Sequence, residues 1–190
     1  MAKPVVVFGS FVVDLMARAD HLPVPGETVK SDLFKMGPGG KGFNQSIALA
    51  KAGIPVYHAG NAGESAEVFR RELEQYGADV RFLKGGDEVC GHAMIQVDSR
   101  GQNCILIFHG SNYNIDEAYV DSVLDQFESG DMVVLQNEIN TTHYIIEEAY
   151  KRGMKIALNP SPYDETIHRM PLEKLSWLVL NEVEVKDLSG

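Results

Sequence analysis

The hydrophobic and polar positions along the chain alternate between short apolar runs and longer amphipathic stretches. Residues 5–8 (Val-Val-Val-Phe) form a continuous apolar run that ends at a glycine, as expected of a parallel strand buried on both faces. Further strands are predicted at 56–59, 80–83, 132–135, 155–158 and 177–180, and helices at 64–76, 116–127, 141–152 and 182–188. This order predicts an α/β fold with a doubly wound, mostly parallel main sheet.

Two segments interrupt this rhythm and predict a second, smaller sheet. Segment 14–36 lacks a helical period, contains turn-forming prolines, and alternates polar and apolar residues from Thr28 to Phe34. Segment 90–109 has two alternating runs on either side of residues 98–102, which is typical of a β-hairpin. We therefore expect one partial α/β domain over residues 1–190, with these two segments forming a small second β-sheet.

The segment Gly37-Pro38-Gly39-Gly40-Lys41-Gly42 predicts a permissive loop that leads into a helix ending at Gly53. Glycines let the main chain approach a ligand closely, and a helix start offers free N–H groups. Lys41 and Asn44 add side-chain donors at the same place. Such a surface suits a hydroxyl-rich or anionic ligand, although an ordinary glycine-rich turn is the simpler interpretation of this segment alone.

Four polar segments follow or adjoin predicted strand ends, at residues 9–14, 37–44, 136–138 and 181–184. Ligands of open α/β sheets bind beyond the carboxyl ends of the strands. The sequence therefore predicts that these segments meet at one edge of the main sheet and form a binding site there.

Composition and charge exclude several classes of function. The chain has 190 residues, 44% of them apolar, and a formal net charge of -10, with no long run of basic residues. This balance argues against nucleic acid and anionic membranes as partners. No apolar stretch approaches the ~20 residues needed to span a bilayer. The chain also lacks the glycine patterns of Walker A and dinucleotide-binding loops.

The two cysteines, Cys90 and Cys104, form neither a Cys-x-x-Cys pair nor a cluster of metal ligands. A disulfide across the predicted hairpin is conceivable, but cytosolic proteins rarely keep disulfides. We expect both thiols to be reduced, in a soluble cytoplasmic protein.

Several motifs, in order, resemble those of the ribokinase, or PfkB-type, family of carbohydrate kinases. They are Gly9-Ser10 followed by Asp14, Pro25-Gly26-Glu27-Thr28, Gly39-Gly40-Lys41-Gly42-x-Asn44-Gln45, Asn159-Pro160-Ser161-Pro162 and Asn181-x-x-Glu184. The resemblance extends from Val5 to Gly190. It implies a ribokinase-like fold and ATP-dependent phosphorylation of a hydroxyl of a small sugar, such as ribose.

The resemblance also implies which residues would bind the sugar. Asp14 and Glu138 would accept hydrogen bonds from its hydroxyls, which are strong when the acceptor is a carboxylate. Val12 stands where ribokinases usually carry asparagine, so one hydroxyl contact is lost or the substrate differs. The residues implied to line the sugar site are Val12, Asp14, Gly40, Lys41, Gly42, Asn44 and Glu138.

For the nucleotide, the resemblance implies that Asn181 faces the ATP phosphates and that Glu184 holds Mg²⁺ through water, because Mg²⁺ keeps several of its waters. A helix N-cap with an acid in the first turn is the alternative for this pair. The family's catalytic base lies in a Gly-Ala-Gly-Asp segment, which this sequence does not contain. We expect no catalytic base in these residues, and we expect the base and any K⁺ site in a further carboxyl-terminal part.

Without that base, the 190 residues alone are expected to be inactive. The resemblance also implies that the small sheet of segments 14–36 and 90–109 covers the sugar site as a lid and pairs with its copy in a homodimer. Two alternatives remain open from the sequence. One is a nucleoside kinase of the same family, and the other is a truncated sugar-binding module without catalysis. A reading frame that continues into Gly-Ala-Gly-Asp would favour the enzyme.

Overall fold

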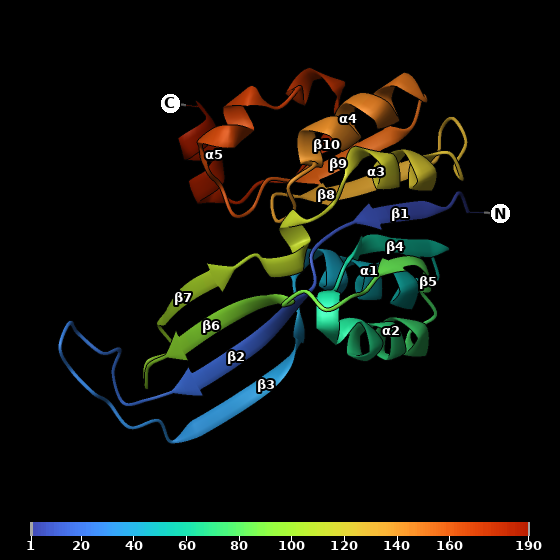
Figure 1. The fold of residues 1–190 in the computed structure, drawn as a ribbon. Helices are drawn as coiled ribbons and strands as arrows, with labels where there is room; N and C mark the ends of the chain where they lie inside the picture. The colour runs from blue at the N-terminus through green and yellow to red at the C-terminus, as the bar shows by residue number, and fades with distance from the viewer. Residues whose placement is uncertain (1, 190) are drawn as a thin grey trace.

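The computed structural model describes residues 2–189 and places them in two sheets (Figure 1). The main sheet has six parallel strands in the order β10-β9-β8-β1-β4-β5. Its strands are β1 (Val5–Phe8), β4 (Val56–Asn61), β5 (Asp79–Lys84), β8 (Met132–Gln136), β9 (Lys155–Asn159) and β10 (Trp177–Leu178). The doubly wound, mostly parallel α/β fold predicted from the hydrophobic pattern is confirmed.

Helices cover both faces of the main sheet, α1 and α2 on one and α3 and α4 on the other (Figure 1). A hydrophobic core lies on each face of the main sheet. Alternate residues of β1 pack into these two cores, because successive side chains of a strand point to opposite faces. Val6 and Phe8 belong to the α3–α4 core, and Val5 and Val7 to the α1–α2 core. The helices are α1 (Lys41–Lys51), α2 (Ala66–Gln75), α3 (Glu117–Leu124), α4 (Thr142–Lys151) and α5 (Glu182–Ser189). Short 3₁₀ turns are η1 (Gly63–Ser65), η2 (Gly110–Tyr113), η3 (Glu165–Arg169) and η4 (Leu172–Lys174).

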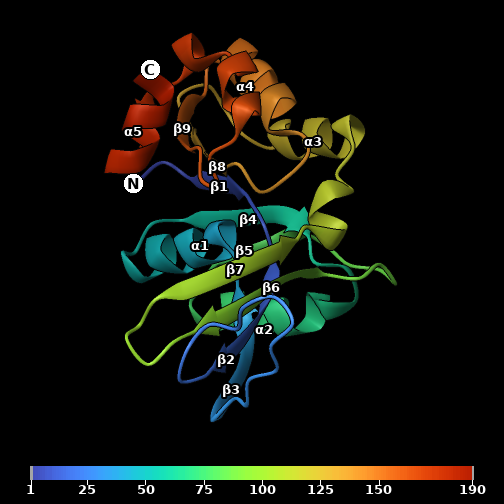
Figure 2. The same ribbon diagram turned by 90° about the vertical axis from the view of Figure 1, so that its left-hand side faces the viewer.

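A second, four-stranded sheet extends from the carboxyl end of β1 away from the main sheet (Figures 1 and 2). Its order is β3-β2-β6-β7, with β2 and β6 parallel and the other two pairs antiparallel. The strands are β2 (Val12–Arg18), β3 (Leu33–Gly39), β6 (Gly91–Val97) and β7 (Asn103–Phe108). A small second sheet built from the two interrupting segments was expected, and it is present.

Two local predictions about this sheet were wrong. Residues 37–39 are not part of a loop, because they form the end of β3 and pair with Val12 to Asp14 of β2. Pro38 is tolerated there because β3 is an edge strand. The alternating stretch from Thr28 has no strand before Leu33. Pairing with β2, which is a tertiary effect, decides both boundaries.

Three other elements differ modestly from the predicted bounds. The helix expected over 64–76 begins with η1 and becomes α-helical only at Ala66. The helix expected over 116–127 ends at Leu124, and the strand expected over 177–180 ends at Leu178.

Both Cys90 and Cys104 are free thiols, the first buried and the second exposed. Within residues 2–189, no helix has the length and apolar character to cross a membrane.

Candidate functional site

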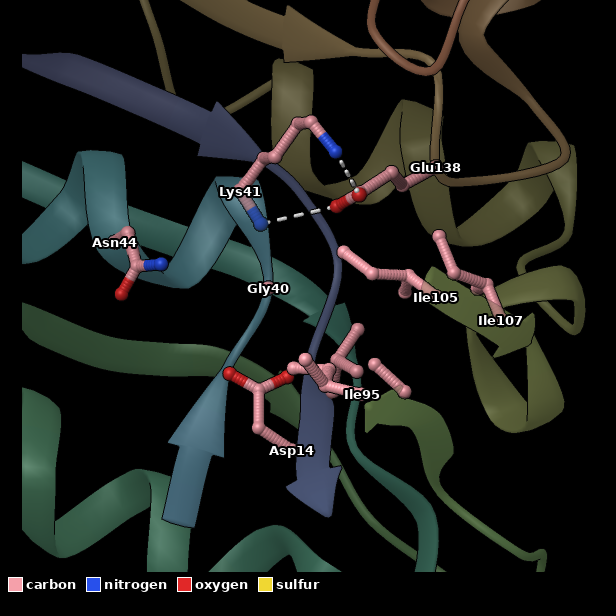
Figure 3. Close-up of a pocket in the computed structure, with 10 residues that line it drawn as sticks. Asp14, Gly40, Lys41, Asn44, Ile95, Ile105, Ile107 and Glu138 are labelled. Carbon is pink, nitrogen blue, oxygen red and sulfur yellow. Dashed lines mark hydrogen bonds and ion pairs between the residues drawn. The ribbon is translucent and has the colours of Figure 1, made fainter. Parts of the chain in front are cut away.

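A cavity of about 190 Å³ lies where the small sheet meets the start of α1 (Figure 3). It is smaller than the roughly 300–1,000 Å³ of pockets for drug-sized ligands, so it suits a small molecule. Six of the seven residues predicted for the sugar site line it, with Asp14 and Glu138 on opposite sides of Gly40 (Figure 3). Its lining consists of Val12, Asp14, Gly40, Lys41, Asn44, Ala93, Ile95, Ile105, Ile107 and Glu138.

Glu138 is the most firmly held side chain of this cavity. It follows the carboxyl end of β8 and is 5% exposed. Its Oε1 lies 2.7 Å from Nζ of Lys41, and its Oε2 accepts a hydrogen bond of 3.0 Å from the backbone N–H of Lys41. The hydroxyl of Ser10 also donates to Oε2. These partners offset the cost of burying the charge and fix the direction of the carboxylate.

Asp14 has a different environment, although it faces the same space. It lies on β2, and its carboxylate makes no hydrogen bond or ion pair with any of residues 2–189. Burial raises the pKa of Asp14, and the nearby charge of Glu138 raises it further, whereas Lys41 lowers it. A half-buried carboxylate without a partner is a hydrogen-bond acceptor available to a ligand.

Glycines make room for these groups. Gly40 has a φ of 104°, and a Cβ there would lie 2.7 Å from the carbonyl oxygen of Ser10. A Cβ at Gly39 would lie 2.2 Å from Oδ2 of Asp14. Gly42, the seventh predicted residue, does not line the cavity, because it packs against Gly9, whose Cα would be 2.4 Å from its Cβ. Its role is close packing of α1 on β1.

The opposite wall of the cavity is apolar and was not predicted. Ala93 and Ile95 of β6 pair with Ile107 and Ile105 of β7, so all four side chains share one face of the small sheet. Asp14 pairs with Ala93 and lies on that face too. The period-2 alternation of the hairpin gives this face, but only the register with β2 shows that it turns toward the glycine segment.

Asn181 and Glu184 lie at a neighbouring hollow of about 450 Å³, which Lys41 and Asn44 also line. Oδ1 of Asn181 accepts hydrogen bonds of 2.9 Å from the N–H groups of Val183 and Glu184. Oε2 of Glu184 accepts in return from the N–H of Asn181 at 3.0 Å. This reciprocal capping box starts α5, so the capping interpretation holds for these two side chains.

Capping leaves Oε1 of Glu184 without a hydrogen bond from the described residues, on a side chain that is 5% exposed. Within residues 2–189, no group of three His, Cys, Asp or Glu side chains is placed to hold a metal ion. A single carboxylate beside a polar hollow fits Mg²⁺ only if water and phosphate oxygens supply most of the ligands. Mg²⁺ is commonly bound in this way with nucleotides.

Comparison with known proteins identifies the class of protein to which this fold and site belong. Residues 2–190 match the model of the pfkB family of carbohydrate kinases, so the chain belongs to that family. It is 32% identical over 191 residues to the deoxyribokinase of Salmonella typhi. The alignment covers 98% of this chain and 62% of the relative, so the chain spans about three-fifths of that protein's length.

Solved structures agree. The ribokinase of Cryptococcus neoformans in complex with ADP matches with a TM-score of 0.87 and 31% identity, over 100% of this chain and 61% of that one. The ribokinase of Arabidopsis thaliana, complexed with ribose and ATP, matches with a TM-score of 0.84 and 29% identity, over 100% and 64% of the two chains. The predicted family and ribokinase-like fold are confirmed.

Proposed function

We propose that this chain is the sugar-binding part of a kinase that transfers phosphate from ATP to a hydroxyl of a small sugar. One observation supports this proposal most. Two carboxylates, Asp14 and Glu138, and the ammonium of Lys41 converge on one small cavity at the carboxyl edge of a parallel sheet. Such a group of acceptors and donors matches the hydroxyls of a sugar, and the small sheet would exclude water from the transfer.

Val12 and the apolar wall of the cavity limit which sugars fit the site. An apolar surface cannot hydrogen-bond a hydroxyl, so a sugar hydroxyl that packs against it loses its water without gaining a partner. We infer that the sugar has an edge without a hydroxyl on this side, as a 2-deoxypentose does. The similarity to a deoxyribokinase supports the same choice.

The nucleotide would lie over the hollow that Asn181 and Glu184 line, next to the sugar cavity. Lys41 and Asn44 border both spaces, so they would stand between the sugar and the phosphates. Mg²⁺, when bound, neutralises charge on the transferring phosphates. Glu184 would hold one of its waters. The catalytic base and any K⁺ site would come from a carboxyl-terminal part outside residues 1–190, and residues 1–190 by themselves would not catalyse the transfer.

We further propose that the protein is cytoplasmic, where free thiols such as Cys90 and Cys104 persist. We also propose that it forms a homodimer in which the small sheets of two copies pair. The sheet face turned away from the cavity supports the dimer. Its middle row, across β3, β2, β6 and β7, is Met36, Leu15, Met94 and Leu106. Met36 is 70% and Leu106 64% exposed. Contiguous exposed apolar patches on soluble proteins commonly mark interfaces.

Calorimetric titration with 2-deoxyribose, ribose, fructose and nucleosides, followed by an assay of ATP consumption, tests the function. The full-length protein should bind a pentose and phosphorylate it, whereas residues 1–190 should bind weakly or not at all and consume no ATP. Tighter binding of a nucleoside than of any free sugar would instead favour a nucleoside kinase. Binding of a pentose without turnover by the full-length protein would favour a non-catalytic module.

A further inference from the structure

Gly9, which links the main sheet to the small sheet, is held to β4 through both of its backbone groups. Its N–H donates to the carbonyl of Ala59 at 3.0 Å. Its carbonyl lies 3.2 Å from Nε2 of His58 and lies close over Gly60, where a Cβ would be only 2.4 Å away. Gly9 cannot shift relative to β4 without breaking these contacts.

The environment of the His58 imidazole favours one role, which is to donate a hydrogen bond to the Gly9 carbonyl. The side chain is fully buried, beside the ring of Phe11 at a centroid distance of 4.3 Å. A carbonyl oxygen only accepts, so Nε2 must carry the proton. Nδ1 then accepts from the hydroxyl of Ser46, 2.7 Å away on α1. Burial lowers the pKa of His58 to about 4, so the ring is neutral near pH 7.

The next residue, Ser10, connects Gly9 directly to the residues of the sugar cavity. The hydroxyl of Ser10 donates to Oε2 of Glu138, and its carbonyl accepts from the N–H of Phe43 at 3.2 Å. Lys41, which also binds Glu138, lies two residues before Phe43 in the first turn of α1. A shift of Gly9 would therefore move Ser10 and misdirect the carboxylate.

We propose that His58, oriented by Ser46, is a positioning residue for the sugar site: it fixes the Gly9 carbonyl and thereby the Ser10 hydroxyl that directs Glu138. This rests on the proposed function, in which Glu138 binds a sugar hydroxyl. His58 itself does not line the cavity, so its effect reaches the ligand only through the backbone of residues 9 and 10.

Three variants of the full-length protein separate positioning from general stability. His58→Leu removes the donor, and His58→Gln places an amide N–H near the position of Nε2. Ile146→Ala removes a fully buried side chain in the α3–α4 core, on the other face of the main sheet, and controls for lost stability. Titration with 2-deoxyribose should show a Kd raised about tenfold or more for His58→Leu. His58→Gln should restore most of the affinity, and Ile146→Ala should keep it.

Amide hydrogen exchange provides a readout that needs no ligand. In His58→Leu, exchange at Lys41 and Phe43 should accelerate, because their N–H groups bond Glu138 and Ser10. In Ile146→Ala it should rise no more than global unfolding requires. If no sugar binds but this pattern appears, the proposed function fails while His58 retains its positioning effect. The proposal is overturned if His58→Leu and Ile146→Ala behave alike, or if glutamine restores nothing.

Discussion

Nζ of Lys41 and Oε1 of Glu138 lie 2.7 Å apart and join the start of α1 to the end of β8 at the cavity that both residues line. The two side chains are 36% and 7% exposed. The buried partner of such a pair depends on the other for its solvation. Each of them also presents polar groups to the cavity, so the ion pair fixes both residues before a ligand arrives.

Glu138→Gln should weaken sugar binding while leaving the fold intact. Glutamine has the same shape but no charge, so it loses the ion pair with Lys41 and the charge-assisted bond from Ser10. A sugar hydroxyl would also lose its charge-assisted hydrogen bond to Glu138, and such a bond is worth about 2 kcal/mol, roughly thirtyfold in Kd. Calorimetric titration measures this. Glu67→Gln on α2, where the side chain is 74% exposed, is the matched control and should bind as the original does.

Asp14→Asn should weaken sugar binding and yet raise stability at neutral pH. The folded-state pKa of Asp14 is raised, chiefly by burial, above the ordinary value of 3.8. As the pH rises through 3.8 the unfolded chain loses this proton first, so ionisation of Asp14 costs stability above its folded pKa and costs none below 3.8.

Thermal unfolding at neutral pH and below pH 3.8 checks the sign for Asp14. Asp14→Asn should have the higher Tm at neutral pH, and the difference should vanish in acid. Asp87→Asn, which changes an exposed carboxylate in the loop after β5, should shift neither Tm nor affinity. A lower Tm for Asp14→Asn at neutral pH would mean that the carboxylate is stabilised by the fold, contrary to its environment here.

The sequence predicted the main sheet well because its central strands, β1 and most of β8, are continuous apolar runs, as expected of a parallel sheet that is covered on both faces. It also predicted that Asp14, Lys41 and Glu138 lie together, since each adjoins a strand end on one edge of the sheet. It did not predict the strand character of residues 37–39, because local glycine and proline content indicates a turn, whereas pairing with β2 decides the outcome.

The hydrophobic pattern could not predict the apolar wall of the cavity or the contact between His58 and Gly9. Ile105 and Ile107 sit in an alternating strand, but the register between strands decides which face turns toward the cavity. His58 lies inside an apolar run and looks like a residue of the core. Its contact with Gly9 arises because β1 and β4, about fifty residues apart, pair in parallel.

Gly40→Ala should destabilise the protein more than an ordinary glycine substitution. A φ of 104° is strained for any other residue, by about 1–3 kcal/mol, and a Cβ would also meet the carbonyl of Ser10 at 2.7 Å. Gly53→Ala tests strain alone, because Gly53 has a φ of 76° and a Cβ there would meet no non-neighbouring atom of residues 2–189 within 4 Å. Urea unfolding should rank Gly40→Ala below Gly53→Ala in the free energy of unfolding. Equal losses would mean that the backbone shifts freely at Ser10.

The dimer prediction is tested on the exposed row of the small sheet. Met36→Glu and Leu106→Glu place charges on this face, where a paired copy would have to desolvate them. Each should lower the apparent mass from that of a dimer to that of a monomer in sedimentation velocity experiments on the full-length protein. Val68→Glu on α2, where valine is 44% exposed, should leave the mass unchanged. A protein that is monomeric before any substitution would refute the prediction.

Val12→Asn should shift the choice of sugar toward one with an additional hydroxyl. Val12 is 6% exposed and lines the cavity, so asparagine there would offer both a donor and an acceptor to a hydroxyl that valine cannot satisfy. The ratio of kcat/KM for ribose to that for 2-deoxyribose should rise about tenfold, since one hydrogen bond in a buried site is worth about 1.4 kcal/mol of discrimination. Val13→Asn lies on the opposite face of β2 and provides the control for lost stability, because it should change Tm but not this ratio. If both variants changed the ratio equally, the selectivity would come from the position of the whole strand and not from the side chain that faces the sugar.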